Sequence, residues 1–151
     1  MDKSQTCLAG KKLPKSQEIF EALGDLDELN ACLGLARSLA SKNLKQQILK
    51  KQDDLIEIGG FLSGMKKEVP LKEKTFVLEK EIKNLVQTKV KGFSRPGVNQ
   101  VSAALHLARA ICRRLERRLV RLNKTSLKNL VIFFNSFSLY LFWLARKQEK
   151  I

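Results

Sequence analysis

The chain has 151 residues, enough for one domain with a buried core and too few for two of ordinary size. Its 29 Lys and Arg outnumber 15 Asp and Glu, and this net charge of +14 points to an anionic partner such as nucleotide, nucleic acid or membrane surface. The three cysteines, an odd number without Cys-x-x-Cys spacing, indicate buried free thiols in a reducing cytoplasm rather than disulfides.

No segment predicts secretion or a membrane span. The amino terminus, MDKSQTCLAG, lacks the apolar run of a signal peptide. The most apolar stretch, LVIFFNSFSLYLFWLA at 130–145, is shorter than the roughly 20 residues that cross a bilayer, and Asn135 and two serines interrupt it. We therefore expect this stretch to be a helix buried in a bundle, without membrane contact.

The first half of the chain predicts three helices. Asp25 and Glu28 have the spacing of a capping box and would open a helix at about 25–41. A second apolar pattern covers 44–62, with Gly59 and Gly60 near its end, and a turn at 64–70 separates it from a charged helix at 71–88.

The second half predicts two more helices. Asn99 is a suitable N-cap for a helix that reaches Leu122, and a last helix fills 127 to about 147. Four or five helices with short connections predict an all-α, up-and-down bundle, with one domain over 1–151 and an N-terminal segment at 1–24.

The helix at 99–122 carries six arginines, and its helical rotation of about 100° per residue divides them into groups. Arg114, Arg118 and Arg121 fall opposite the apolar arc and are expected in solvent. Arg109, Arg113 and Glu116 lie on the flank. The arc itself is predicted to be Ala104, Ala108, Ile111, Leu115 and Leu119.

The flank residues allow two interpretations. They could be surface charges whose pairs contribute only about 0.2 to 0.5 kcal/mol each. Alternatively, Arg109 and Arg113, one turn apart, could present fork-shaped donors to a carboxylate or to phosphate oxygens. The charge pattern alone leaves both open.

Four blocks of the sequence resemble the PduO-type ATP:cob(I)alamin adenosyltransferases, in the same order and at compatible spacing. The third block is similar to the specific family pattern of an aromatic, a Pro-Gly turn and LHxARxxCRRAER. The blocks are GKKLPKSQEIFEALGDLDELNACLGLA, IEIGGFLS, FSRPGVNQVSAALHLARAICRRLERR and NLVIFFNSFSLYLFWLAR.

This resemblance implies the family's fold, assembly and reaction. The fold would be a helical bundle assembled as a homotrimer, with active sites between neighbouring subunits. Co(I) of cobalamin would attack the 5′ carbon of ATP and release triphosphate, in a reaction that depends mostly on positioning and charge stabilisation. The implied ligands are ATP, Mg²⁺ and the corrinoid, and a corrinoid reductase or an adenosylcobalamin-dependent enzyme would be a partner in the cytoplasm.

Matching positions give the implied corrinoid site. Phe93 resembles the aromatic that packs under the corrin and keeps the lower axial base away from cobalt, although it could instead be a core anchor before a turn. Asp27 and Arg109 resemble a pair that forms a salt bridge across the subunit interface. His106, on the LH of the motif, is expected to be a packed, hydrogen-bonded core residue rather than a base.

The resemblance also implies an ATP site, assembled from both ends of the chain. Arg113 matches an arginine that contacts triphosphate, and Glu116 an acidic member of the same cluster that would serve Mg²⁺ or orient the arginines. The other implied ATP residues are Thr6 and Gly10 from the partial nucleotide loop, Lys15 of the Pro-Lys step and Asn135 of the last helix.

The chain departs from the family pattern in places that leave other functions open. Of the family's T-x-T-G-D-x-G-x-T loop only MDKSQT is present, with Ser4 where glycine is expected. Ser136 and Leu139 replace an arginine and an aspartate, and Val98 replaces a glycine. A non-catalytic relative that binds or delivers corrinoid is therefore the alternative. A basic nucleic-acid-binding bundle is least favoured, because no nucleic-acid motif is recognised.

Overall fold

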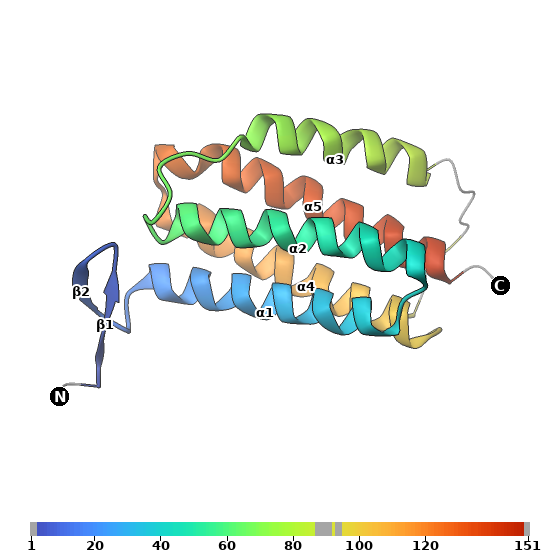
Figure 1. The fold of residues 1–151 in the computed structure, drawn as a ribbon, viewed down its shortest axis with the longest axis horizontal. Helices are drawn as coiled ribbons and strands as arrows, with labels where there is room; N and C mark the ends of the chain where they lie inside the picture. Colours follow the sequence, from blue (N-terminus) through green and yellow to red (C-terminus); the bar gives the residue numbers. More distant parts are fainter. Residues whose placement is uncertain (1–2, 87–91, 93–94, 150–151) are drawn as a thin grey trace.

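The computed structural model describes residues 3–86, 92 and 95–149. These residues form five α-helices and one short β-hairpin, which confirms the predicted all-α bundle (Figure 1). The α-helices are α1 (Glu18–Leu39), α2 (Lys42–Leu62), α3 (Leu71–Val86), α4 (Gln100–Leu122) and α5 (Lys128–Gln148), with a 3-10 turn, η1 (Thr125–Leu127), directly before α5.

The helices lie side by side along a common direction, and α4 packs between α1 and α5 (Figure 1). α2 packs on α1, and α3 packs on α5. Helix α5 supplies the aromatic centre of the core. Its Phe133, Phe134 and Phe137 are almost fully buried, with ring centroids 5.3 to 6.4 Å apart. All five residues predicted for the inner arc of α4 are buried as expected.

Helix α1 begins seven residues earlier than predicted, at Glu18 instead of Asp25. The capping box assigned to Asp25 and Glu28 was wrong, because Asp25 lies inside the helix and its side chain is buried at the contact with α4. Glu18 and Glu21 occupy the first turn, where negative charge favours a helix N-terminus.

The other predicted boundaries agree more closely with the structure. Asn99 caps α4 as predicted, since its side chain accepts a hydrogen bond of 2.8 Å from the backbone N–H of Ser102. After Leu122 the chain leaves α4 through Asn123 in the left-handed conformation. α3 is described to Val86, and its predicted end at 88 lies outside the described residues.

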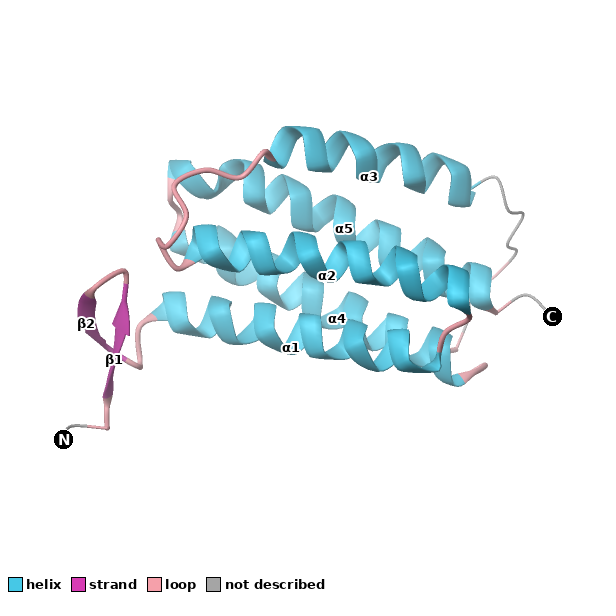
Figure 2. Cartoon of the chain, viewed as in Figure 1, coloured by secondary structure: helices cyan, strands magenta, loops and turns pink. Residues whose placement is uncertain are grey.

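The β-hairpin at the N-terminus was not predicted. β1 (Gln5–Leu8) pairs antiparallel with β2 (Lys11–Pro14) through a two-residue turn in which Ala9 and Gly10 both have positive φ. Such a turn matches the twist of the two strands. The hairpin stands at the end of the bundle where α1 begins (Figure 2). It approaches the turn after α2 closely, since a Cβ on Gly64 would lie 2.9 Å from the Cβ of Ala9.

One helical stretch, Thr125–Gln148, is long and apolar enough to cross a membrane by length and composition alone. Its most apolar window has a mean hydropathy of 1.3, and half of that window is buried inside the bundle. The buried half contains the phenylalanine cluster, as the sequence predicts for a core helix.

Candidate active site

The outer flank of α4 carries three of the predicted site residues. Arg109, Arg113 and Glu116 follow one another at helical spacing, so they share one face. Arg109 is half-buried, and its guanidinium carbon lies 5.9 Å from the ring centroid of Phe142 on α5. The Arg109 Nε is buried and makes no hydrogen bond among the described residues. A buried donor without a partner is unfavourable, so this unsatisfied Nε indicates that the surroundings of Arg109 are incomplete in a single chain.

Arg113 and Asn135 lie at the same level of two antiparallel helices. Cys112 Sγ donates a hydrogen bond of 3.4 Å to the carbonyl of Phe134, which aligns the middle of α4 with the middle of α5. Arg113 and Asn135, one residue further on each helix, are both exposed. Glu116, one turn beyond Arg113, is half-buried. In the described part of the chain, neither Arg113 nor Glu116 forms an ion pair.

Arg114 and Arg118 were wrongly expected in solvent. Arg114 Nε lies 2.9 Å from Asp25 Oδ1, and Arg118 Nε lies 2.7 Å from Asp25 Oδ2. Arg114 also pairs with Glu28, and Arg118 with Glu21. Asp25 is only 5% exposed, and its hydrogen bond raises the pKa of Arg114. These two arginines hold α4 against α1, whereas the neighbouring Arg113 is exposed.

Asp27 is exposed on α1 and does not meet Arg109 within one chain. Two residues along a helix correspond to a rotation of about 200°, so Asp27 points away from the α4 contact that holds Asp25. The described residues contain no ion-pair partner for Asp27. The pair implied by the resemblance joins different subunits, and a single chain does not test it.

The hairpin gathers the three N-terminal residues of the predicted ATP site. Thr6 pairs with Leu13 across the ladder, and Gly10 lies in the turn with φ +78°. Lys15 is exposed, and its backbone N–H donates to the Ser4 carbonyl at 2.8 Å, which closes the open end of the hairpin. No contact joins these three residues to Arg113 or Asn135 in the described chain.

A groove of about 560 Å³ lies between the hairpin and the adjoining ends of α1, α2 and α4. Leu8, Leu13 and Ile19 supply apolar walls, and Lys11 and Lys124 stand at its sides. None of the predicted site residues that the structure describes lines it. The groove separates the hairpin from the bundle and is a different place from the α4 flank.

Some predicted or relevant residues stand apart from this description. Phe93 lies outside the described residues. His106 is buried with its Nε2 2.8 Å from Glu149 Oε1, as expected for a packed, hydrogen-bonded histidine. Phe142, which contacts Arg109, was missed. Its signal was present, because Asn135, Leu139 and Phe142 recur at helical spacing along α5.

A preformed metal cluster is absent from the part of the chain that the structure describes, since no three His, Cys, Asp or Glu side chains gather there. This is compatible with Mg²⁺ as ATP carries it, because Mg²⁺ is commonly held by one or two carboxylates together with substrate phosphates. Glu116 is the carboxylate on the face of Arg113 that could serve in this way.

The cysteines are free but not uniformly buried, which corrects the sequence interpretation. Cys7 is exposed, Cys32 is half-buried and Cys112 is buried. Burial raises the pKa of the Cys112 thiol far above its usual value.

At pH 8, iodoacetamide is expected to modify Cys7 rapidly and Cys112 only after unfolding, because the thiolate is the reactive form. Peptide mass mapping with and without denaturant checks this, and rapid folded-state labelling of Cys112 would contradict it.

Comparisons with known proteins agree on one family. Residues 1–148 match the family described as "Cobalamin adenosyltransferase". The corrinoid adenosyltransferase of Bacillus subtilis is 32% identical over 162 residues, which cover 96% of this chain and 81% of that protein. Human corrinoid adenosyltransferase MMAB is 34% identical over 166 residues, which cover 94% of this chain and 66% of that protein. The chain thus spans about two thirds of the human relative.

Solved structures show the same fold. A variant of the PduO-type ATP:corrinoid adenosyltransferase from Lactobacillus reuteri, complexed with cobalamin and ATP, superposes with a TM-score of 0.89 at 32% identity. The match covers 98% of this chain and 90% of that one. A second variant of that protein, complexed with ATP, has the same TM-score at 31% identity.

Proposed function

The chain belongs to the cobalamin adenosyltransferase family, and we propose that it transfers the 5′-deoxyadenosyl group of ATP to cob(I)alamin. The observation that carries this proposal is the outer face of α4. There Arg109, half-buried with an unsatisfied Nε, lies one turn from Arg113, which is exposed and forms no ion pair with the residues that the structure describes. This face therefore offers adjoining sites for a large partly apolar ligand and for phosphate oxygens.

The reaction needs charge stabilisation at the leaving group. Co(I) attacks the 5′ carbon of ATP, a cobalt–carbon bond forms, and the carbon–oxygen bond breaks with its electron pair leaving on triphosphate. Arg113 and Asn135, level with each other on α4 and α5, donate to the triphosphate oxygens, and Lys15 on the hairpin adds a further positive charge. Fixed donors of this kind stabilise developing negative charge without reorganising.

The corrinoid occupies the neighbouring part of the same face. Arg109 and Phe142 supply a partly desolvated wall, and Phe93 packs under the corrin and excludes the lower axial base. In a homotrimer, Asp27 of one subunit would pair with Arg109 of the next. The exposure of Asp27 supports this arrangement, and the unsatisfied Nε of Arg109 indicates that the surroundings of this half-buried arginine are incomplete in a single chain.

The other predicted ATP-site residues have smaller roles in the proposed reaction. Thr6 and Gly10 belong to the partial nucleotide loop on the hairpin, and Glu116 contributes one carboxylate to Mg²⁺ or orients Arg113. We place the protein in the cytoplasm, where a corrinoid reductase supplies Co(I) and an adenosylcobalamin-dependent enzyme takes up the product.

A second candidate is a relative that binds or delivers corrinoid without catalysis. Leu139 favours it, because this side chain is 47% exposed on the stripe of α5 that also carries Asn135. The family pattern has an aspartate at this position, and Ser136 replaces the matching arginine. An apolar surface there suits corrinoid or protein contact better than it suits a triphosphate.

Anaerobic incubation with ATP, Mg²⁺ and chemically reduced cobalamin tests the proposed function. We expect the absorbance of adenosylcobalamin to develop and one triphosphate to be released for each product. Bound corrinoid without product at saturating ATP would reject the enzyme and support the carrier. Salt-sensitive binding of random RNA or DNA without corrinoid binding would instead support the basic nucleic-acid bundle.

Phe93→Ala is expected to lower turnover from Co(II) by about tenfold or more while leaving ATP binding nearly unchanged. The reason is that an apolar ring under the corrin excludes an axial ligand and makes cobalt easier to reduce. Turnover with a reductant and ATP titration are measured on the same variant. Equal losses in both would mean that Phe93 only supports the fold.

A further inference from the structure

A buried polar chain joins the start of α4 to the end of α5. Its first link is His106, whose Nε2 lies 2.8 Å from Glu149 Oε1, with side chains that are only 5% and 7% exposed. Burying a carboxylate is unfavourable unless it is paired and hydrogen-bonded. The proposed reaction requires no histidine base, so this buried pair needs another explanation.

Arg146 extends this row of linked polar side chains to Gly92, in the segment that precedes α4. Its Nη1 lies 2.7 Å from Glu149 Oε2, and its Nη2 donates to the backbone carbonyl of Gly92 at 3.3 Å. Arg146 is itself buried. A planar guanidinium has several donors in fixed directions, so it can hold a carboxylate and a carbonyl at once. One buried arginine therefore ties Gly92 to the last turn of α5.

A second anchor reaches the same turn from the other side of the Pro-Gly motif. Asn99 Nδ2 donates to the Gln148 carbonyl at 2.8 Å, while its Oδ1 caps α4. Gly92 has φ +85°, in the left-handed region that favours glycine. The Gly92 carbonyl that Arg146 holds belongs to the peptide bond leading into residue 93.

We infer that Arg146, Glu149 and His106 are positioning residues for the corrinoid reaction, because they hold the backbone carbonyl of Gly92, the residue that directly precedes Phe93 in the sequence. This inference rests on the proposed adenosyltransferase function. The three residues act through Gly92 and not on the reacting atoms. His106 lies one turn before Arg109 on α4. The linked side chains of His106, Glu149 and Arg146 therefore connect the helix face proposed to bind corrinoid to Gly92, which precedes Phe93.

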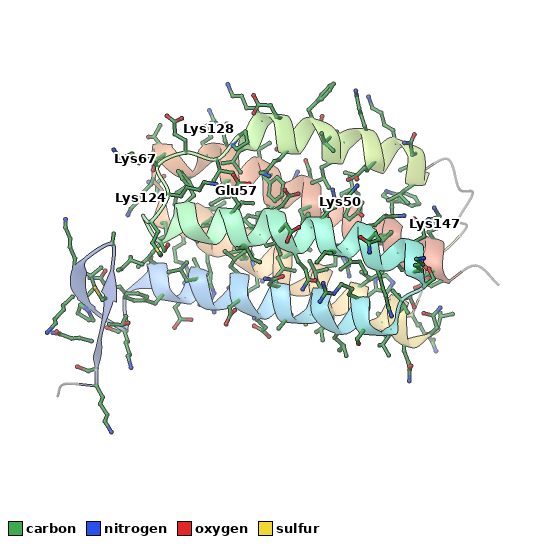
Figure 3. All side chains as sticks on the ribbon, in the orientation of Figure 1. Lys50, Glu57, Lys67, Lys124, Lys128 and Lys147 are labelled. Atoms are coloured by element: carbon green, nitrogen blue, oxygen red, sulfur yellow. The ribbon has the colours of Figure 1, made fainter. Side chains whose placement is uncertain are left out.

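Proteolysis tests the anchoring without any ligand. Trypsin cleaves after Lys91, so its rate at the bond into Gly92 reports how firmly the Gly92 backbone is held. Arg146→Gln removes the bond to the Gly92 carbonyl and is expected to raise cleavage there about tenfold, since hydrogen bonds to charged groups are among the stronger ones. Lys147→Gln is the matched control, because it removes one positive charge from the same helical turn at an exposed position (Figure 3).

Kinetics test the consequence for catalysis. In Arg146→Gln, turnover from Co(II) with a reductant is expected to fall about tenfold, because a small misplacement of a positioned group can cost up to about 100-fold. The KM for ATP should stay within about twofold of the original value, since ATP binds elsewhere on the α4 face. Glu149→Gln keeps the size of the side chain and should act in the same direction, which provides a second variant if Arg146→Gln folds poorly.

The outcomes of the two experiments separate the anchoring of Gly92 from the positioning role in catalysis. Equal tryptic rates in Arg146→Gln and Lys147→Gln would overturn the anchoring. Faster cleavage with unchanged turnover would overturn the positioning role and leave a purely structural one. An unmodified protein that makes no adenosylcobalamin would overturn the proposed function together with the catalytic role, whereas the tryptic comparison would still decide the anchoring.

Discussion

Replacing Arg113 by alanine is expected to lower kcat for adenosylcobalamin formation by about 10²- to 10³-fold, the usual loss when a donor to developing negative charge is removed. Arg113 is exposed and has no ion pair in the described chain, so its charge is available to the leaving triphosphate. Its removal leaves no buried partner behind. The melting temperature should therefore change little, because surface substitutions usually alter stability by less than about 0.5 kcal/mol.

Arg121→Ala is the matched control for Arg113→Ala. Arg121 is an exposed arginine two turns further along α4, outside the proposed site. Steady-state kinetics at saturating corrinoid and thermal unfolding are measured on both variants. If Arg113→Ala behaves like Arg121→Ala, then the charge on this face serves solubility and not catalysis. Loss of ATP affinity without loss of kcat would place Arg113 in ground-state binding alone.

The helical architecture could be predicted from local sequence signals. Periodic apolar residues located all five α-helices, and the Asn99 cap set the start of α4 correctly. Both signals depend on neighbours within one or two turns, which sequence spacing displays directly. The β-hairpin was not predicted, because each strand has only four residues. An alternation of apolar and polar residues over so short a length does not stand out from chance.

The partners of charged side chains could not be predicted in the same way. A helical wheel placed Arg114 and Arg118 opposite the core of α4, but it contains no information about the acidic residues on α1 that meet them. Asp25 has the spacing of a cap, and only the earlier start of α1 shows that it is an interior residue. Long-range ion pairs depend on helix docking, which a local pattern does not encode.

The candidate site was predictable to a similar extent. The sequence placed Arg109, Arg113 and Glu116 on one flank of α4, and the structure agrees. Their chemical environment was not predictable, because the contact of Arg109 with Phe142 depends on how α4 packs on α5. Residue positions on one helix follow from geometry, whereas desolvation depends on the neighbouring helix.

Asp25→Ala is expected to destabilise the folded chain by about 2 to 3 kcal/mol. Removing one member of a buried ion pair typically costs about 3 to 5 kcal/mol because the remaining charge loses its partner. The loss is smaller here, since Arg114 and Arg118 have side chains that are 38% and 31% exposed and can recover some hydration. Asp25→Asn should lose about as much, because its amide has a single acceptor oxygen and its NH2 group would face the other arginine donor.

Asp27→Ala, two residues further along α1, is expected to affect activity and not stability, the opposite of Asp25→Ala. Asp27 is exposed and has no ion pair in the described chain, so its removal should leave the unfolding free energy within about 0.5 kcal/mol. Adenosyl transfer should fall strongly, however, because Asp27 would pair with Arg109 of the neighbouring subunit. Urea unfolding and the activity assay on both variants distinguish the roles. Equal stability losses would mean that the Asp25 ion pairs contribute nothing beyond helix propensity. An active Asp27→Ala variant would remove this aspartate from the corrinoid site.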